Sequence, residues 1–526
     1  MTRQDREHWV LCGGASSPSA PNNALRLRWS EDSGQKRNLT VDIDGMSDSV
    51  GARIPARFRD LVRIAAYVLA ADQRFSRGDL EDTDDSRWRR HLRFVVSVED
   101  LDFWNDTSIA NLLAVTLSGL SDDLFSFEFC GAGNHPPEQI AFHDDEGGGS
   151  FATLGQVDAV QLFSGGMDSL AGAAQRILSA RKRVILVSHR SSDKVTSWQR
   201  HLVRELRARP GAAIPAHVAI RVEKHAAELR HERTQRTRSF LYASMAGAVA
   251  HVVGLDSVQF YENGVKSIHL PVSEALRGAR ASKTTHPEVL QGFTRILSAV
   301  SDRNFRVENP FEFMTRAEVL DVLNDAGAID LLKHTVSCGK VHSIGSEAPH
   351  CGLCDQCIER RMAVVARGME VHDPAMRYHI DLAKGPRERD VDRAFAVDYV
   401  AAADRFTKYA RPIEFMADNG MAERAVPAFM ETNGISAEVV QSRIFELHKR
   451  HGDQVQRAIG RLMDQCSVEL RTPAGIPPNS LLALLRNEGL GGTAGTDSSA
   501  PVASGGAPFQ FRRWGDHWFV RFRGGT

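Results

Sequence analysis

Residues 157–169 read VDAVQLFSGGMDS, in which an apolar run leads into two glycines flanked by serine residues. The run predicts a buried strand, and the small residues after it predict a helix that begins at the glycines. Paired glycines let a ligand approach the backbone closely, and the first turn of a helix attracts negative charge. The stretch therefore predicts a phosphate-binding loop at a strand-to-helix turn. This loop consists of Ser164, Gly165, Gly166, Met167, Asp168 and Ser169.

The chain after this loop alternates between strand-like and helix-like segments. Strand-like runs occupy 183–189, 217–223 and 257–264, and helical periodicity covers 194–208 and 237–253. Such alternation is typical of a parallel sheet with crossover helices, and ligands bind such sheets at the carboxyl ends of the strands. We therefore expect an α/β fold whose ligand site is the loop at 164–169.

The flanking regions differ from this pattern. Alternating segments at 25–29 and 39–43 fit a β-hairpin, and with the helical run at 58–75 they predict a small α+β domain. Apolar spacing after residue 385 predicts a mainly helical extension, and a Gly/Ser-rich tract predicts a linker. We expect five parts: an N-terminal α+β domain at 1–155, the phosphate-loop domain at 156–385, a helical domain at 386–490, a linker at 491–508 and a C-terminal β-hairpin at 509–526.

The charge balance is even. Lysine and arginine number 65 against 66 aspartate and glutamate residues, so neither nucleic acid nor a membrane is expected as a partner of the whole surface. Basic residues concentrate at 200–238, where solvated helix faces explain most of them. A nucleic-acid groove is the alternative, weakened because that stretch has no aromatic residue to stack on bases. With no signal peptide and no long apolar run, we expect a cytoplasmic protein.

Four of the seven cysteines lie within twenty residues. They are Cys338, Cys351, Cys354 and Cys357, spaced C-x12-C-x2-C-x2-C. Four thiolates at this spacing suit a tetrahedral Zn²⁺ ion that closes a loop and leaves no open position for catalysis. An iron–sulfur cluster is the alternative, because C-x2-C-x2-C runs also bind iron. The remaining cysteines, Cys12, Cys130 and Cys466, are expected to be small buried side chains.

The loop lacks the lysine of a Walker P-loop and resembles the PP-loop of ATP pyrophosphatases. Together with the cysteines it is similar to the QueC family, whose pattern ends in CGxCxxCxxR, matched here from Cys351 to Arg360. Residues 308–320, ENPFEFMTRAEVL, look like the QueC segment that contains T-K-A-E, with Arg316 where lysine is usual. Residues 236–246 resemble the segment in which an arginine, here Arg238, opens a helix beside the nucleotide.

This resemblance implies an ATP-dependent synthase or ligase that forms AMP and pyrophosphate. It implies ATP and Mg²⁺ on the loop, with Asp168 helping to hold the metal and with Arg238 and Arg316 neutralising the departing charge. The implied substrate is 7-carboxy-7-deazaguanine, whose carboxylate is adenylated and then attacked by an amine. Because extra domains flank the QueC-like region, the chain most resembles QueC-like proteins of anti-phage defence, of the QatC type or from CBASS operons. That resemblance allows the N-terminus of a partner protein from the same operon as the acceptor.

Three alternatives stay open at this level. In the first, the amine is ammonia and the protein is a 7-cyano-7-deazaguanine synthase. In the second, the protein is a tRNA-thiolating PP-loop enzyme. In the third, the fold is a non-catalytic scaffold that senses a nucleotide. The general base is also open. Its candidates are His189, His269, His286 and Glu262. A homodimer is compatible with the sequence.

Overall fold

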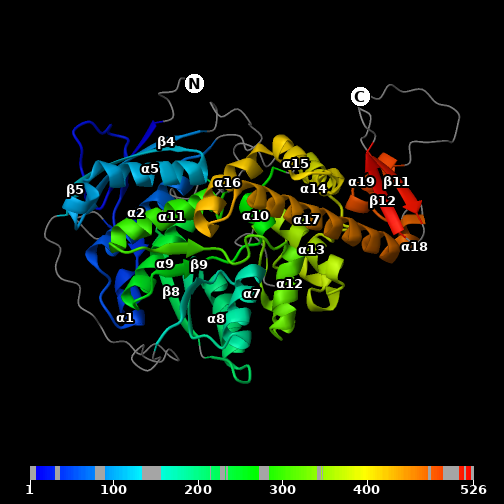
Figure 1. The fold of residues 1–526 in the computed structure, drawn as a ribbon. Coiled ribbons are helices and arrows are strands. Elements are labelled where there is room, and N and C mark those ends of the chain that lie inside the picture. Colours follow the sequence, from blue (N-terminus) through cyan, green and yellow to red (C-terminus); the bar gives the residue numbers. More distant parts are fainter. Residues whose placement is uncertain are drawn as a thin grey trace.

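The computed structural model of the protein describes residues 7–29, 36–77, 89–132, 156–213, 215–225, 232, 235–271, 283–339, 345, 347–471, 475–489, 509–514 and 517–522. Two sheets and the helices around them form the left and centre of Figure 1, and long helices extend to the right. The predicted linker at 491–508 lies outside the described residues. Within the described ranges, no helix is long and apolar enough to cross a membrane.

The central sheet has six strands in the order β10-β9-β6-β7-β8-β3. Their bounds are β3 (Leu39–Val41), β6 (Ala159–Leu162), β7 (Val184–Arg190), β8 (Ala216–Lys224), β9 (Ser257–Gln259) and β10 (Arg306–Glu308). Five of them are parallel, which confirms the predicted α/β sheet. From β6 the chain proceeds through β7 and β8 to one side, whereas β9 and β10 lie on the other. The strand order thus reverses between β6 and β9, the position at which open α/β sheets bind ligands.

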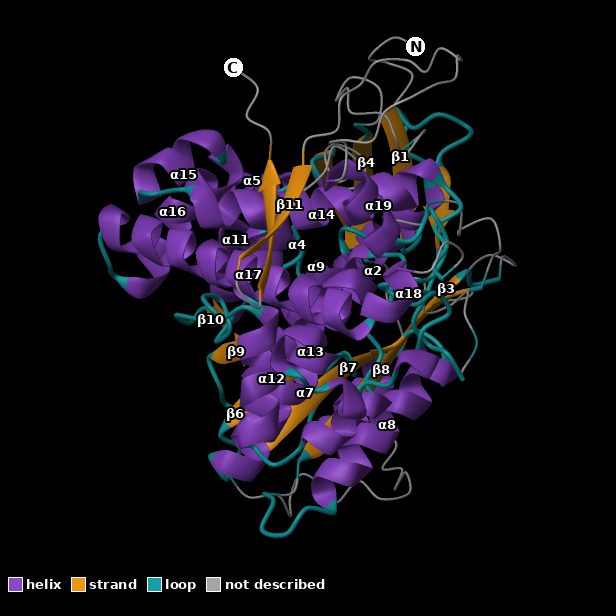
Figure 2. Ribbon diagram, turned by 90° about the vertical axis from the view of Figure 1, so that its right-hand side faces the viewer, coloured by secondary structure: helices purple, strands orange, loops and turns teal. Residues whose placement is uncertain are grey.

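Helices cover both faces of this sheet (Figure 2). Side chains alternate along β7, so Val184 and Leu186 pack on one face, and Ile185 and Val187 pack on the other. The first face carries α7 (Met167–Ala174), its π-helical continuation (Gln175–Ser179), α8 (Asp193–Arg207) and α12 (Arg316–Asp325). The second face carries α9 (Arg238–Val252) and α11 (Pro287–Ser301).

The N-terminal region forms its own sheet, in the order β2-β1-β4-β5. Its strands are β1 (Glu7–Cys12), β2 (Leu25–Leu27), β4 (His91–Val98) and β5 (Leu124–Gly131), and its helices are α1 (Ile43–Val50), α2 (Ala56–Arg74), α4 (Leu101–Trp104) and α5 (Thr107–Ser121). Every strand pair is parallel, and α2 and α5 lie on the connections that lead to β4 and to β5, so this region is α/β where α+β was predicted. The predicted hairpin is also wrong. β2 pairs with β1, and β3 pairs antiparallel with β8, where it covers an edge of the central sheet.

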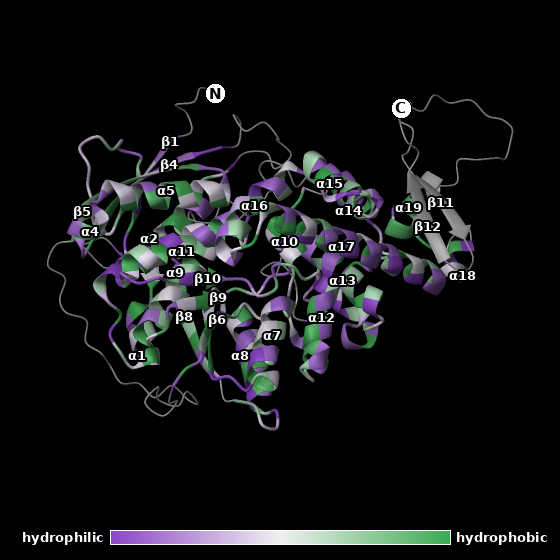
Figure 3. Cartoon of the chain, in the orientation of Figure 1, coloured by the Kyte–Doolittle hydropathy of each residue, from purple (hydrophilic) through white to green (hydrophobic). Residues whose placement is uncertain are grey.

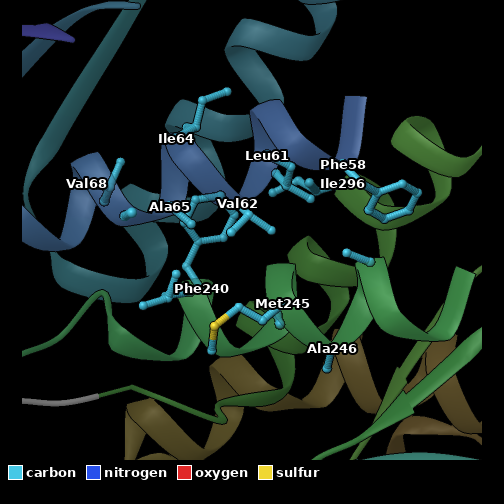
Figure 4. Close-up of a cluster of buried hydrophobic side chains, with 14 of the residues drawn as sticks. Phe58, Leu61, Val62, Ile64, Ala65, Val68, Phe240, Met245, Ala246 and Ile296 are labelled. Atoms are coloured by element: carbon cyan, nitrogen blue, oxygen red, sulfur yellow. The ribbon is translucent and has the colours of Figure 1, made fainter. Parts of the chain in front are cut away.

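The two sheets share one hydrophobic core. Figure 4 shows Leu61, Val62 and Ala65 of α2 facing Phe240 and Met245 of α9. A polar contact accompanies this packing, because the Asp72 carboxylate of α2 accepts hydrogen bonds from the backbone N–H and the hydroxyl of Thr237, both at 3.1 Å. Thr237 immediately precedes α9, so the N-terminal region caps a helix of the central unit.

The C-terminal half of the chain is mainly helical. Its elements are α10 (Gly264–Ile268), the 3₁₀ turns Ile329–His334, Glu370–His372 and Ala375–Arg377, α13 (Asp355–Arg367), α14 (Asp390–Lys408), α15 (Pro412–Asp418), α16 (Gly420–Asn433), α17 (Ala437–Gln465), α18 (Ser467–Arg471) and α19 (Leu481–Gly489). The apolar side of α17, with Val455, Ile459 and Leu462, packs on α13 and α14, and its other side carries hydrophilic residues (Figure 3). The chain ends with β11 (Phe509–Trp514) and β12 (His517–Phe522), which pair antiparallel as predicted.

Candidate nucleotide site and four-cysteine cluster

The glycine loop joins β6 to α7, as the sequence predicts. Gly165 has φ +80°, a left-handed conformation that favours glycine, and a Cβ there would lie 3.2 Å from Cγ of Gln199. The hydroxyls of Ser164 and Ser169 lie 3.2 Å apart, and that of Ser164 accepts the backbone N–H of Gly166 at 3.3 Å. These bonds close a tight turn at the N-terminus of α7, where an anion is favoured.

Asp168, in the first turn of α7, faces the end of β9. Its Oδ2 accepts two hydrogen bonds from Asn263, one from the backbone N–H and one from the side-chain amide, both at 3.0 Å. Its Oδ1 is buried and has no hydrogen-bond partner among the described residues. The carboxylate therefore spans the reversal between β6 and β9 and keeps one oxygen for another ligand, as a site for a hard cation such as Mg²⁺ requires.

Arg316 contacts this carboxylate and is buried, with only 3% of its surface exposed. Its Nη2 is 3.5 Å from Asp168 Oδ2 and 3.2 Å from Glu262 Oε1. On its other side, its Nε is 3.5 Å from Oε1 of Glu359, on α13. One guanidinium thus contacts three carboxylates, and its positive charge offsets part of the cost of burying them.

Local sequence explains why Arg316 points here. Thr315 caps α12 by accepting the N–H of Glu318 at 3.2 Å, and the Glu318 carboxylate accepts the N–H of Thr315 at 2.8 Å, which is a capping box. Glu318 also pairs with Arg450 of α17 at 2.8 Å. The helical extension therefore holds the start of α12, and with it Arg316.

Of the four candidate bases, Glu262 is the one that contacts this cluster. Burial and the charge of Asp168 raise the pKa of Glu262 to about 8, against the opposing effect of Arg316. Burial lowers the pKa of His269 and of His286 to about 3. The ring of His189 is also buried and bonds through Nε2 to the carbonyl of Val222 at 3.1 Å. Among these groups only Glu262 combines proximity to Asp168 and Arg316 with a pKa suited to proton transfer near neutrality.

The four predicted cysteines come together. All four Sγ atoms lie within 4.8 Å of one another, with Cys338 and Cys354 at 4.0 Å and Cys351 and Cys357 at 3.9 Å. A tetrahedron with Zn–S bonds of about 2.3 Å has edges of about 3.8 Å, so the set fits zinc. The backbone N–H groups of Leu353 and Cys354 point at Cys351 Sγ, at 3.4 and 3.3 Å, as suits a thiolate. The cluster can therefore bind Zn²⁺ with all four positions filled by protein.

The cluster adjoins the glycine loop on one side. Val336, two residues before Cys338, donates its N–H to the carbonyl of Gly165 at 3.2 Å. Arg360, which is fully buried, bonds to the Thr335 hydroxyl at 2.6 Å and to Asp373 at 2.8 Å. The arginine that ends the CGxCxxCxxR pattern thus fixes the segment between the loop and the cysteines.

The cluster also sets the start of α13. Asp355 directly follows Cys354 and pairs with Lys266 of α10 at 2.5 Å, while Gln356 accepts a hydrogen bond from Arg316 at 3.4 Å. Together with Glu359, these residues tie the cysteine cluster to Asp168. Sequence reasoning missed this group on α13. The sequence does carry a signal for the contact between Asn263 and Asp168. Glu262-Asn263-Gly264 follows a strand, and the carboxyl end of that strand lies at the same edge of the sheet as the glycine loop.

The structure does not bring Arg238 to this group. Arg238 is exposed at the start of α9, with its guanidinium 6.0 Å from the centroid of the Tyr242 ring. Tyr242 in turn contacts His189, at 6.0 Å between ring centroids, at the carboxyl end of β7. Arg238 therefore lies near the carboxyl ends of the parallel strands, but no contact joins it to Asp168 or Arg316 among the described residues.

Comparison with known proteins shows that one part of the chain that forms this site is similar in sequence to a known family. Residues 261–368 match the model of the family described as "Queuosine biosynthesis protein QueC". The 7-cyano-7-deazaguanine synthase of Methanocaldococcus jannaschii is 27% identical over 86 residues, which cover 16% of this chain and 36% of that protein. The matched segment holds Glu262, Asn263, Arg316, Glu359 and the four cysteines. Residues 261–368 are therefore QueC-like, and the glycine loop that they contact lies outside the matched range.

Proposed function

We propose that the protein activates the carboxylate of 7-carboxy-7-deazaguanine with ATP and then joins it to an amine as an amide. The observation that carries this proposal is the pair of hydrogen bonds from Asn263 to Asp168, because they connect the glycine loop to the QueC-like segment. A carboxylate is a poor electrophile, and adenylation converts it into an acyl group with a good leaving group. The products of the first step are the acyl adenylate and pyrophosphate.

The glycine loop, residues 164–169, would hold the pyrophosphate end of ATP as in a PP-loop. The free Oδ1 of Asp168 is the oxygen that would contact Mg²⁺, which neutralises phosphate charge when bound. Arg316 fixes the orientation of Asp168 through their ion pair at 3.5 Å. Arg238 would neutralise departing charge from the start of α9, near the carboxyl end of β7.

Glu262 is the group that we assign to accept the proton of the attacking amine. It lies beside Asp168 and Arg316, and its side chain is 25% exposed, so a ligand can reach it. A carboxylate whose pKa lies near neutrality is a better base than an ordinary glutamate and is still ionised in part of the population.

We favour the N-terminus of a partner protein over ammonia as the amine, in anti-phage defence, because large additional regions flank the QueC-like segment. Ammonia, giving 7-cyano-7-deazaguanine, is the second candidate and is supported by the named relative. A thiolating activity has less support. The cysteines outside the cluster are Cys12 and Cys130 of the N-terminal sheet, and Cys466 after α17, and none contacts the glycine loop.

The test is turnover with defined products. Protein, ATP, Mg²⁺ and 7-carboxy-7-deazaguanine should yield AMP and pyrophosphate, and turnover should rise on addition of the correct amine. Formation of ADP, or no consumption of ATP with ammonia or with coexpressed neighbouring proteins, contradicts the proposal. Intact-mass analysis of those neighbouring proteins then separates protein conjugation from small-molecule synthesis.

A further inference from the structure

A groove of about 610 Å³ runs along the solvent face of α8. It begins at Arg190, the last residue of β7, and continues over the first three turns of the helix. Its charged and aromatic lining residues are Arg190, Asp193, Trp198, Arg200, His201 and Arg204. Figure 3 shows hydrophilic and hydrophobic residues side by side on α8, in keeping with one buried and one exposed face.

The groove is positively charged although the chain as a whole is near neutral. Its one lining carboxylate, Asp193, is 94% exposed and pairs with Arg190 at 3.2 Å. No described carboxylate lies within 4 Å of Arg200, and the nearest to Arg204 is Glu205, at 3.9 Å. Arg200 and Arg204 are one helical turn apart on the same face, so their guanidinium groups present a short row of charge.

Trp198 supplies a flat apolar surface in the same groove, on the side of α8 away from Arg200, since residues two apart on a helix do not face each other. Its side chain is half-buried, and the ammonium of Lys194 lies 5.1 Å from its ring centroid. The stretch 200–238 contains no aromatic residue, but Trp198 stands just before it in sequence and lines the same groove. Arginines for phosphates and an aromatic ring for a base are the two elements of sequence-independent binding to single strands.

The opposite face of α8 supports the glycine loop. Gln199, between Trp198 and Arg200, donates a hydrogen bond from its amide to the carbonyl of Ser164 at 3.2 Å. The groove therefore lies on the outer side of the helix that borders the candidate nucleotide site, and it shares no residue with that site.

We propose that this groove binds single-stranded nucleic acid, with phosphates on Arg190, Arg200 and Arg204 and a base stacked on Trp198. The ligand is recognised by its backbone charge and by stacking, so no particular base sequence is required. The inference is independent of the proposed function, since binding needs neither ATP nor a deazaguanine.

The experiment measures fluorescence anisotropy of a fluorescein-labelled 12-nucleotide oligouridylate with the full chain, from 50 to 300 mM KCl. Binding should weaken with salt, with a slope of log Kobs against log[KCl] of about −2 for three phosphate contacts. The double variant R200E/R204E should weaken binding at least tenfold and flatten the slope, and R200Q/R204Q should do so to a smaller extent. Trp198→Ala should weaken binding about tenfold at constant slope, whereas Trp198→Phe should retain most of it.

The matched control is R457E/R461E, which makes the same charge change at the same spacing on an exposed part of α17. It should change the Kd less than twofold, and saturating ATP should not displace the RNA. The proposal is overturned if no binding occurs at 50 mM KCl, or if the control pair weakens binding as much as the groove pair. It is also overturned if a 12-residue glutamate peptide displaces the RNA at equal concentration, since the groove then recognises acidic protein. Release of AMP by R200E/R204E should equal that of the wild type, which separates this proposal from the enzymatic one.

Discussion

The guanidinium of Arg316 lies 3.5 Å from the carboxylate of Asp168, while Asn263, on the loop after β9, bonds to the same carboxylate oxygen. Asp168 belongs to the glycine loop, and Arg316 and Asn263 belong to the QueC-like segment. Two parts of the chain that carry different sequence signatures thus share one charge cluster. Arg316 and Asn263 therefore hold the same carboxylate oxygen of Asp168 from two different elements.

Replacing Asp168 by asparagine should lower AMP formation at least a hundredfold. The amide keeps the volume of the side chain but removes the negative charge that would hold Mg²⁺. The melting temperature should change little, because Arg316 still contacts Glu262 and Glu359. Asp193→Asn, in the first turn of α8 and 94% exposed, is the control and should keep full activity. Wild-type turnover in Asp168→Asn would remove Asp168 from the mechanism.

Substitutions of Arg316 should separate its charge from its shape. Arg316→Met leaves the buried carboxylates of Asp168 and Glu359 without this cation and should cost roughly 3–5 kcal/mol of unfolding free energy. Arg316→Lys keeps the charge but cannot reach both sides of the cluster, so it should fold and retain part of the activity. Denaturant unfolding of both variants, with the exposed Arg306→Met as a control within about 0.5 kcal/mol of wild type, measures the difference. Equal stability of the Met and Lys variants would contradict the assigned role.

Purified protein should contain one zinc ion per chain. Cys354→Ser should lose most of the metal and also most of the activity, because Cys354 precedes α13 and its residues Asp355, Gln356 and Glu359. Cys130→Ser, outside the cluster, should keep both. Inductively coupled plasma mass spectrometry gives the metal content. Iron with acid-labile sulfide would replace the zinc assignment.

Gly352 should be intolerant of any side chain. It has φ +77°, and a Cβ there would lie 1.9 Å from the carbonyl oxygen of Ile380, a backbone atom that cannot move freely. Gly352→Ala should therefore displace Cys351 and Cys354 and lower both zinc content and melting temperature. Gly339→Ala is a control in the same loop, because a Cβ at Gly339 meets no atom of the described residues within 4 Å. A normal zinc content in Gly352→Ala would show that the loop adapts.

Local patterns predicted the parts of this site that are local. The glycine loop, the parallel sheet and the grouping of four cysteines each follow from residues close in sequence. The contacts of Arg316 do not, because its partners lie on α7, on the loop after β9 and on α13. The burial that raises the pKa of Glu262 arises only when these elements meet.

The errors in the N-terminal region have the same origin. Residues 25–27 and 39–41 alternate as strands do, but three-residue strands carry little information about their partners. β3 pairs with β8, which is far away in sequence, and the long helix α2 makes a parallel sheet possible by connecting distant strand ends. The alternating segments suggested a hairpin, whereas tertiary packing places β2 and β3 in two different sheets.

Glu262→Gln should make the protein more stable above neutral pH and less active. Burial and Asp168 raise the pKa of Glu262 to about 8 in the folded protein, well above an ordinary value of about 4.5. The folded state therefore binds more protons than the unfolded state between about pH 4.5 and 8, and wild-type stability falls as pH rises through this window. Glutamine cannot ionise, so the variant does not lose stability in this way.

In magnesium-free buffer the two proteins should have the same melting temperature at pH 5, and the variant should melt a few degrees higher at pH 8.5. Amide formation should drop at every pH because the proton acceptor is gone. If the variant is less stable than the wild type at pH 8.5, ionised Glu262 stabilises the fold through Arg316. If the variant forms the amide at the normal rate, another group accepts the proton.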